Sequence, residues 1–506
     1  MIQPLTAARL WCMASLKRRE FYLLLLVLIM GFALRMAFLH EPFERDEGVY
    51  STIGQQILRG DIPYRDAVEI KTPGILYLYA AMISLVGPSM EGIRILTAFY
   101  SMATTCAIFW LARNIAGPVS GLWAAFFFAL FSGAPRLQGS SSNSEVFMLL
   151  PAVLTICMLI AWIDSDKRRY LVFSGIFAGL TLVVKTVAAP LMLLLGLIVM
   201  FRPSTVHRFS GRVVDAMIFG LPFIIISGLI AIYFHTHNAL DDLIYWCFTF
   251  MQRYRSPVLF SQYPAKFLLT HHLVILEHLF LWLAGLPAMV WFLYSRRDIK
   301  IVLSVCYLAA AIVGVCLPGF FYPHYYIQLM PPLAILAGLG TGAVWELRGK
   351  VRFSVPAVVF ISVVGYFAYD YAFYFVYTPE EVSTHKYGAQ GIWFSEARNI
   401  GAYINRNSTP DDSIFQWGFE PEVYFYADRK ITNKYNTHII VQYSQNPFQA
   451  SYELMWNLAK NRPKYIIVYE AHMDAPGYES IELVLKQYYQ FIGKWRGGVN
   501  LYKRIE

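Results

Sequence analysis

The stretch FYLLLLVLIMGFALRMAFLH, residues 21–40, decides the class of this chain. As a helix it is long enough to cross about 30 Å of hydrocarbon. It lacks a small-residue cleavage site, so we expect an uncleaved signal anchor. The basic stretch SLKRRE precedes it, and such residues stay on the cytoplasmic side of a membrane. The chain is therefore predicted to begin with a membrane-spanning helix and a cytoplasmic N-terminus.

The composition predicts that the chain crosses the membrane many times. Of its 506 residues 57% are hydrophobic and only 15% are charged, and the mean hydropathy is +0.46, values outside those of soluble domains. The net charge of +9 comes from short Lys and Arg clusters between apolar runs, which indicates cytoplasmic loops rather than a nucleic-acid-binding face. The six cysteines show no Cys-x-x-Cys spacing, so we expect no disulfide framework.

Ten further apolar runs follow the first one and predict about eleven spans in total. The runs lie near residues 92–112, 119–134, 145–163, 171–184, 187–201, 214–234, 273–294, 301–317, 326–345 and 354–376. An odd number of spans places the C-terminus outside. Basic residues fall on the turns that this topology makes cytoplasmic: 167–169, Arg202, Arg208, Arg212, Arg296, Arg297, Lys300, Arg348, Lys350 and Arg352.

The chain divides into two predicted domains. Residues 1–378 form a transmembrane domain with a first outer loop at 41–73, and residues 379–506 lose the membrane character and form an outer domain. Strand-like runs such as RPKYIIVYE alternate there with helical runs, and Gly497 and Gly498 separate a closing pair of strands. The predicted fold is a polytopic α-helical membrane protein with a small C-terminal α/β domain.

The stretch FERDEGVY, residues 43–50, places two adjacent acids just beyond the first span. A carboxylate at a membrane surface can act as a general base when an electrophile lies at the same depth. The alternative interpretation is a solvated start of a loop. The residue types alone leave both interpretations open.

The rest of the first outer loop carries a resemblance. DEGVY followed by KTPGILYLYA resembles the C-type membrane glycosyltransferases, in particular the protein O-mannosyltransferase-like and lipid A aminoarabinose transferase-like group. Three further stretches are similar to that group: MEGIRILTAFYS with Arg94, NSEVFMLLP with Glu145, and PHYYIQLMPPLAIL with His324 and Tyr325. The chain departs from the aminoarabinose transferase pattern in having Lys-Thr-Pro where that pattern has Lys-Pro-Pro.

The resemblance implies a reaction and a role for each residue. The donor is a sugar on a polyprenyl phosphate, and an acceptor hydroxyl displaces the phosphate with inversion. Asp46 is the predicted general base and Glu47 its orienting neighbour. The predicted substrate-binding residues are Lys71, Arg94, Glu145, Arg253, Arg255, His324 and Tyr325. No cofactor and no metal ion are expected. The cations also have ordinary interpretations, because Lys71 could snorkel, Arg94 could neutralise Glu91 and His324 could merely pack.

Other functional classes stay open at this point. A transporter would also have many spans, although the acids cluster outside rather than at mid-membrane. A glycan polymerase or ligase with a lipid-pyrophosphate donor would keep the same fold and base, and a scaffold would act through its tail. The expected partners are the lipid-linked donor, a lipid, glycan or protein acceptor and membrane lipids, at the outer face of the inner (plasma) membrane, with no nucleic acid.

Overall fold

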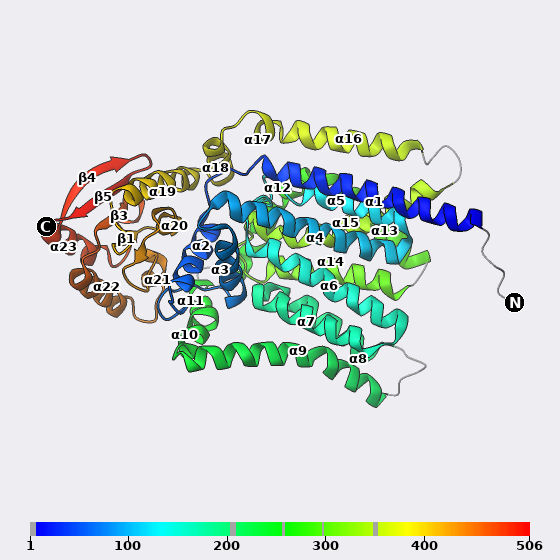
Figure 1. Cartoon of the computed structure of the whole chain (residues 1–506), viewed down its shortest axis with the longest axis horizontal. Helices are drawn as coiled ribbons and strands as arrows, with labels where there is room; N and C mark the ends of the chain where they lie inside the picture. The colour runs from blue at the N-terminus through cyan, green and yellow to red at the C-terminus, as the bar shows by residue number, and fades with distance from the viewer. Residues whose placement is uncertain (1–6, 203–208, 256–258, 296–297, 348–352, 506) are drawn as a thin grey trace.

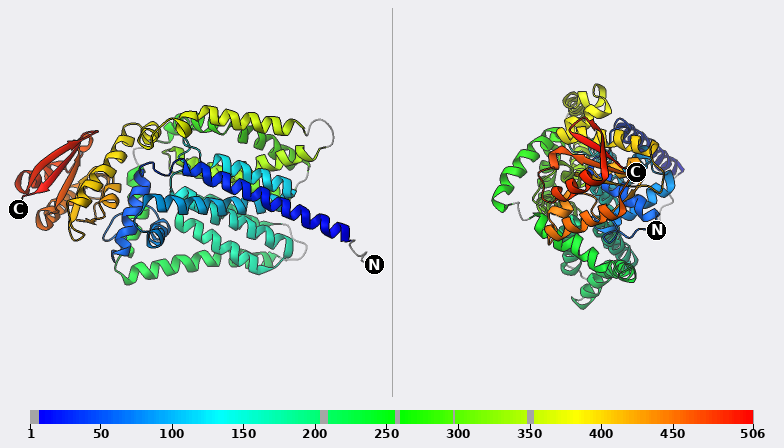
Figure 2. Two further views of the ribbon diagram at one scale, coloured as in Figure 1. Left: turned by 45° about the horizontal axis from the view of Figure 1, so that its top comes forward. Right: turned by 90° about the vertical axis from the view of Figure 1, so that its left-hand side faces the viewer.

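The computed structural model describes residues 7–202, 209–255, 259–295, 298–347 and 353–505. A bundle of long helices and a smaller domain with a β-sheet lie end to end (Figure 1). The left view of Figure 2 shows the same arrangement, with the C-terminus at the far tip of the smaller domain. The predicted fold class, a helical membrane protein with a small C-terminal sheet domain, is confirmed.

The long helices of the bundle coincide with the predicted apolar runs. They are α1 (Ala7–Met36), α4 (Met90–Ala116), α5 (Pro118–Phe131), α6 (Ser144–Ser165), α7 (Arg168–Val184), α8 (Ala189–Phe201), α9 (Phe209–Thr236), α13 (Leu279–Ser295), α14 (Ile299–Cys316), α15 (Met330–Glu346) and α16 (Ser354–Tyr369). Among the described residues five helices are long and apolar enough to cross a membrane, or six if one bent pair forms a single span, and four more apolar helices are shorter. The count of about eleven spans stays a prediction.

One predicted run is divided in the structure. Residues 273–294 form the end of α12 (Tyr263–Glu277) and most of α13, and the two helices meet at 94°. The ring nitrogens of His278, at the corner, lie 2.8 Å from the carbonyl oxygen of Val274 and 3.1 Å from that of Phe131. The carboxylate of Glu277 accepts a bond from the backbone N–H of Arg136. Buried polar groups that need partners thus turn the chain where hydropathy predicts a straight helix.

The described basic residues of the predicted cytoplasmic turns lie at the end of the bundle away from the smaller domain. Arg168 follows α6 there and pairs with Asp215 at 2.8 Å, and Lys300 pairs with Asp164 at 2.8 Å. Residues Arg208, Arg296, Arg297, Arg348, Lys350 and Arg352 lie outside the described residues.

The smaller domain begins with α18 (Pro379–Tyr387) and α19 (Ala389–Arg406). Its five-stranded sheet has the order β2-β1-β3-β5-β4, built from β1 (Ser413–Trp417), β2 (Lys430–Ile431), β3 (Tyr465–Tyr469), β4 (Tyr489–Trp495) and β5 (Val499–Arg504). Strand β1 pairs in parallel with β2 and β3, and β5 pairs antiparallel with β3 and β4. Gly497 and Gly498 adopt φ of 70° and 75° in the turn before β5, a conformation that glycine adopts without strain. Helices α20 (Glu422–Ala427), α21 (His438–Gln442), α22 (Pro447–Asn461) and α23 (Tyr478–Tyr488) complete the domain.

Two helices of the first loop join the bundle to this domain: α2 (Arg45–Leu58) and α3 (Pro73–Val86). Glu44 caps α2 in a capping box with Glu47. Helix α2 lies against α20, where Thr52 donates to the carbonyl oxygen of Pro421 at 2.8 Å and Phe43 N–H donates to the Tyr426 hydroxyl at 2.8 Å. The start of α2, which carries the acidic pair, is therefore held between the bundle and the smaller domain.

The close approach of α2 and α20 depends on Gly48. A Cβ added at Gly48 would lie 2.6 Å from Glu422 Cβ and 2.8 Å from Glu422 N. We expect Gly48→Ala to separate the two helices and cost about 1–3 kcal/mol, which a thermal unfolding measurement of the purified protein in lipid would detect as a lower Tm.

The matched control for this substitution is Gly228→Ala on α9, where an added Cβ meets nothing within 4 Å. Alanine there should preserve or slightly raise the Tm, because it favours the helix over glycine. Equal Tm values for the two variants would show that α2 and α20 do not need their close contact.

Candidate active site

A cavity of about 350 Å³ lies where the bundle meets the smaller domain. The bundle contributes its floor from the start of α2, the loop before α3 and the segment around 320–325. The smaller domain contributes the roof from α18, α19 and the segments 419–421 and 436–440. The lining includes Glu44, Arg45, Asp46, Glu69, Lys71, Gln138, Tyr254, Phe320, Tyr322, His324, Tyr325, Lys386, Tyr387, Gln390, Phe394, Phe419 and Thr437.

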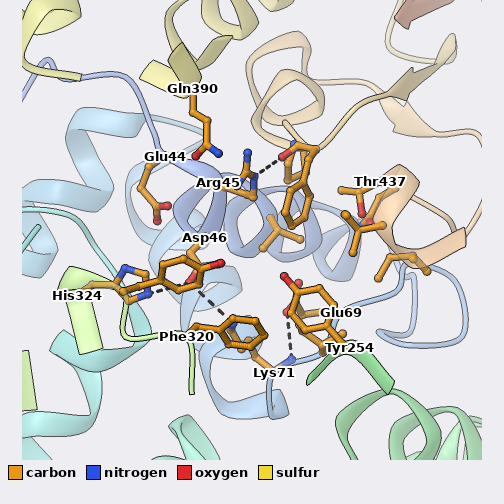
Figure 3. A pocket seen from close by; sticks show the side chains of 18 of the residues that line it. Glu44, Arg45, Asp46, Glu69, Lys71, Tyr254, Phe320, His324, Gln390 and Thr437 are labelled. Atoms are coloured by element: carbon orange, nitrogen blue, oxygen red, sulfur yellow. Dashed lines mark hydrogen bonds and ion pairs between the residues drawn. The ribbon is translucent and has the colours of Figure 1, made fainter. Parts of the chain in front are cut away.

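Three of the predicted site residues converge on the floor of this cavity (Figure 3). Asp46 Oδ2 lies 3.9 Å from Lys71 Nζ and 4.0 Å from His324 Nε2. Both separations exceed the range of direct hydrogen bonds, about 2.7–3.2 Å. Lys71 therefore neutralises Asp46 without being locked onto it, and Lys71 and His324 can each turn toward an anion in the cavity.

The backbone of Lys71 is fixed from three sides. Its carbonyl oxygen accepts bonds from the Tyr64 hydroxyl at 2.7 Å and from the Cys247 thiol at 3.3 Å. Its N–H donates to Glu69 at 3.0 Å. Pro73 then starts α3, and proline at the first helical position has no N–H that needs a partner. The Lys-Thr-Pro turn thus aims the Lys71 ammonium at Asp46.

His324 is the second residue of the short helix η4 (Pro323–Leu329). Its other ring nitrogen, Nδ1, is held by a residue that the sequence analysis did not name. Gln138 Oε1 lies 2.9 Å from His324 Nδ1. Gln138 adopts φ of 58°, and Arg35 of α1 donates to the next carbonyl oxygen, that of Gly139, at 2.7 Å. The sequence signal for this residue is RLQGSSSN at 136–143, a polar stretch between two apolar runs.

A second buried ion pair lies beside the cavity. Lys185 occupies the break between α7 and α8, where its Nζ lies 2.7 Å from Glu145 Oε1 and donates to Ser144 Oγ at 2.9 Å. Its ammonium also lies 5.6 Å from the centre of the Tyr325 ring. Glu145, predicted to bind substrate, is fully buried here and does not line the cavity, whereas Tyr325 does.

Glu47 and Arg94, which were predicted to take part in the chemistry, bind each other below the cavity. Arg94 donates to both carboxylate oxygens of Glu47, at 2.8 and 3.3 Å. The N–H of Ser142 donates to the same carboxylate at 2.7 Å. Glu47 is 0% exposed and neither residue lines the cavity. Their geometry orients α2, and Glu91, the alternative partner of Arg94, instead faces His40 at 3.3 Å.

Arg253 and Arg255 lie outside the cavity lining. Arg253, in α11 (Phe250–Arg255), donates to the carbonyl oxygens of Ser444 and Gln445 in the smaller domain, at 3.3 and 3.1 Å. Arg255 donates to the Tyr263 hydroxyl at 3.1 Å. Met251 and Tyr254 of the same helix line the cavity instead. The substrate-binding roles of both arginines stay predictions.

Arg45, the neighbour of Asp46, was also missed by sequence reasoning. Its guanidinium donates to the carbonyl oxygen of Phe419 at 2.6 Å and pairs with Glu420 at 3.0 Å. The Phe419 ring centre lies 3.9 Å from the guanidinium carbon, a cation–π distance. The residue before the candidate base thus reaches into the smaller domain.

The carboxyl groups around the cavity have opposite environments. Burial alone would raise the pKa of Asp46, but the charges of Lys71, then His324 and Lys185, outweigh it and lower that pKa to about 2. Burial raises the pKa of Glu69 although Lys71 opposes it, and burial with the charges of Asp46 and Glu47 raises the pKa of Glu44. Carboxyls whose environments differ in this way are typical of sites that move protons.

Among the described residues, no group of three or more His, Cys, Asp and Glu side chains is arranged to hold a metal ion. The absence of a cofactor stays a prediction.

Known proteins resemble the chain in sequence and in fold. Residues 70–232 match the family described as dolichyl-phosphate-mannose-protein mannosyltransferase. No curated protein matches the chain significantly.

The structure of ArnT from Cupriavidus metallidurans bound to undecaprenyl phosphate is similar with a TM-score of 0.62 and 12% identity, over 96% of this chain and 98% of that chain. The archaeal oligosaccharyltransferase AglB from Archaeoglobus fulgidus, in complex with an inhibitory peptide and a dolichol phosphate, is similar with a TM-score of 0.53 and 13% identity, over 97% of this chain and 74% of that chain. The predicted C-type glycosyltransferase fold is confirmed.

The buried Glu47–Arg94 pair generates a stability prediction. Glu47→Gln or Arg94→Met alone leaves an uncompensated buried charge or donor and should cost about 3–5 kcal/mol, whereas the double variant removes both charges and should recover a large part of the loss in Tm. Thermal unfolding of the four proteins in lipid measures this coupling.

The exposed pair Arg65–Asp66, at 2.7 Å and with side chains 41% and 32% exposed, is the control, and its double variant should change stability by at most about 1 kcal/mol. A Glu47→Gln protein with the wild-type Tm but no activity would instead assign Glu47 to the chemistry.

The low pKa of Asp46 generates a pH prediction. A group whose pKa is lowered on folding stabilises the native state above its unfolded pKa, near 3.9 for aspartate, and loses that contribution as the pH falls toward the folded value of about 2. Because Asp46 also raises the pKa of the neighbouring His324 imidazole, which would add a pH dependence of its own, the comparison is made in proteins that lack this imidazole. The Tm difference between His324→Gln and the double variant His324→Gln/Asp46→Asn should therefore be constant from about pH 7 to 5 and shrink below about pH 4. A difference that already changes between about pH 7 and 5 would contradict the lowered pKa.

Proposed function

We propose that this chain, a glycosyltransferase of C-type fold, moves a sugar from a polyprenyl-phosphate donor to an acceptor hydroxyl with inversion at the anomeric carbon. The observation that carries the proposal is the convergence of Asp46, Lys71 and His324 on one cavity floor, at 3.9 and 4.0 Å. A carboxylate between a lysine and a histidine supplies the base and the anion-binding groups that such a displacement needs.

Asp46 is the proposed general base. The acceptor oxygen forms a bond to the anomeric carbon while its proton passes to Asp46, and the bond from that carbon to the phosphate oxygen breaks with its electron pair on the leaving phosphate. Lys71 and His324 face Asp46 in the empty cavity. When a phosphate shares their charge, the pKa of Asp46 rises from its low value, so the carboxylate becomes a better proton acceptor at the moment the donor is present.

Lys71 and His324 are the proposed ligands of the phosphate. Both line the cavity, and their positive charge stabilises the negative charge that grows on the leaving group in a partly dehydrated site. Lys185 lies behind them and adds a third positive charge at Asp46. Tyr325 completes the floor at this point.

The roof of the cavity is the proposed acceptor side. Gln390 and Thr437 of the smaller domain present polar side chains to the cavity, and Phe394 and Phe419 also line it. Hydroxyl-bearing acceptors need hydrogen-bonding groups and apolar surfaces of this kind. Residues 379–506 would then cover the donor and select the acceptor, whether that is a lipid, a glycan or a protein hydroxyl.

The proposed location is the outer face of a cytoplasmic membrane, with the N-terminus cytoplasmic. This orientation is supported by Arg168 and Lys300. Arg168 begins α7, whose other end leads to Lys185 beside the cavity, and Lys300 lies at the start of α14, whose other end leads to the lining segment around 320–325. A lipid phosphate at the headgroup level of the outer leaflet would then reach the cavity floor.

The test is sugar transfer by purified protein in lipid with a panel of radiolabelled polyprenyl-phosphate sugars. Asp46→Asn should lower turnover by at least about 10²-fold because the base is lost, while donor binding persists because both cations remain. Lys71→Gln should instead weaken donor binding.

Asp66→Asn is the matched control, since Asp66 lies in the same loop, outside the cavity lining, and pairs with Arg65. It should keep wild-type turnover. Transfer that is as fast in Asp46→Asn as in Asp66→Asn would overturn the proposed base, and a wild-type protein that consumes none of the donors would overturn the proposed function.

A further inference from the structure

The charges around the cavity floor are already balanced in the empty site. Each lysine or arginine among the residues that line the cavity faces a carboxylate: Lys71 faces Asp46 at 3.9 Å, Arg45 faces Glu420 at 3.0 Å and Lys386 faces Glu41 at 2.9 Å. Lys185 behind the floor faces Glu145 at 2.7 Å. A lipid phosphate brings a further negative charge into this partly dehydrated space, where an uncompensated charge is costly.

His324 is the lining side chain that can add a positive charge near neutral pH, because histidine ordinarily titrates near pH 6.5. His324 is 8% exposed and lies at the cavity floor. The groups that face it are Asp46 from α2, Lys71 from the loop before α3, Glu145 from α6 and Lys185 from the break between α7 and α8. Beside it on its own segment lie the rings of Tyr322 and Tyr325.

Gln138 decides which ring nitrogen can exchange a proton. With the amide oxygen 2.9 Å from Nδ1, that nitrogen must carry a hydrogen, since an amide oxygen only accepts. A neutral His324 therefore has its lone pair on Nε2, the nitrogen that lies 4.0 Å from Asp46. Nε2 and the Asp46 carboxylate, both hydrogen-bond acceptors, then face each other across the cavity floor. A proton on Nε2 makes the imidazole positively charged and turns Nε2 into a donor that faces the cavity.

The position of Gln138 is itself held by the bundle. Its N–H donates to the carbonyl oxygen of Pro135 at 2.9 Å, and its backbone has φ of 58°, a region that non-glycine residues adopt only when their surroundings impose it. Arg35 donates to Gly139 just after it. Gln138 is 7% exposed and lines the cavity. Its side chain thus contacts His324 on one side and the cavity on the other.

We propose that binding of the donor's phosphate is coupled to uptake of one proton by His324 at Nε2, and that Gln138 is the positioning residue that reserves Nε2 for this proton by holding Nδ1–H. This inference rests on the proposed function. It adds that the site binds the monoanionic phosphodiester of a lipid-linked sugar by acquiring a charge rather than by a preformed excess of cations. It also assigns a role to a residue outside the motifs of the chain.

The test measures binding of undecaprenyl methyl phosphate to the full chain in lipid nanodiscs. This diester carries one charge that does not titrate near neutral pH and no sugar, so the result is independent of the donor sugar and of the phosphate's own protonation. Calorimetry in buffers of different ionisation enthalpy counts the protons taken up, and the dissociation constant is followed from about pH 5.5 to 8.5, on both sides of the ordinary histidine value.

Wild-type protein should take up close to one proton at pH values above the pKa of the free imidazole, and its affinity should fall by up to about tenfold per pH unit as the pH rises in that range. His324→Gln should bind more weakly and lose the pH dependence. Gln138→Glu, whose carboxylate keeps Nδ1–H and favours the imidazolium, should shift the pH range upward, and Gln138→Leu should shift it downward. A merely structural role of Gln138 would change affinity equally at every pH.

The control is His235→Gln, an exposed histidine at the end of α9 and outside the cavity lining, which should keep the wild-type proton count. Binding without proton uptake in wild type overturns the inference and leaves the proposed function intact, and so does an unchanged proton count in His324→Gln. If His324→Gln does not bind the diester, the inference is decided by the wild-type proton count and by the shifts in pH range of the two Gln138 variants. A wild-type protein that does not bind the diester at any pH contradicts the phosphate site itself.

Discussion

A buried ion pair holds the helix on which the candidate chemistry depends. Glu47 lies one residue after Asp46, and it receives Arg94 from α4 at 2.8 Å and the backbone N–H of Ser142 at 2.7 Å. Because successive helical residues point about 100° apart, fixing Glu47 toward the bundle turns Asp46 toward the cavity. The two adjacent acids therefore have different tasks. Glu47 anchors the helix in a dry interior and Asp46 faces the cavity.

The smaller domain is part of this arrangement rather than an attachment to it. Arg45, on the other side of Asp46, binds Phe419 and Glu420, and Gly48 allows the backbone of α20 to approach. Arg45 thus contacts the smaller domain, Asp46 the cavity and Glu47 the bundle. A cavity made in this way can cover a lipid headgroup that enters from the membrane side while presenting different side chains to an acceptor from the other side.

The electrostatics of the cavity follow from loosely opposed charges. Asp46 keeps its negative charge because Lys71 lies near it, yet the distances of 3.9 and 4.0 Å leave Asp46, Lys71 and His324 able to exchange partners. In the proposed function, an entering phosphate competes with Asp46 for Lys71 and for a protonated His324. Donor binding and the basicity of Asp46 would then be linked through shared charge, a coupling that no single residue possesses alone.

The sequence alone determined the features that depend on local chemistry. The apolar runs predict the bundle helices because hydrocarbon requires about twenty apolar residues and internally paired backbone, and Gly497 and Gly498 predict the last turn. Asp46 of the acidic pair, the Lys-Thr-Pro turn and PHYYIQ predict residues that the structure brings to one cavity. The exception among the runs is 273–294, where the polar groups of Glu277 and His278 need partners in the 131–136 segment and bend the chain.

Only the tertiary structure decided which charged side chains meet. Glu47 and Glu145 are acids like Asp46, and Arg94 is a cation like Lys71. All lie in motifs of equal weight, but burial and pairing divide these residues into anchors and cavity groups. Arg253 and Arg255 face other partners, and Gln138 enters the site from a loop with no motif. These assignments depend on contacts between residues far apart in the sequence, such as Glu47 and Arg94, 47 positions apart, and Gln138 and His324, 186 positions apart. Such pairings arise from the packing of whole helices, which local sequence does not encode.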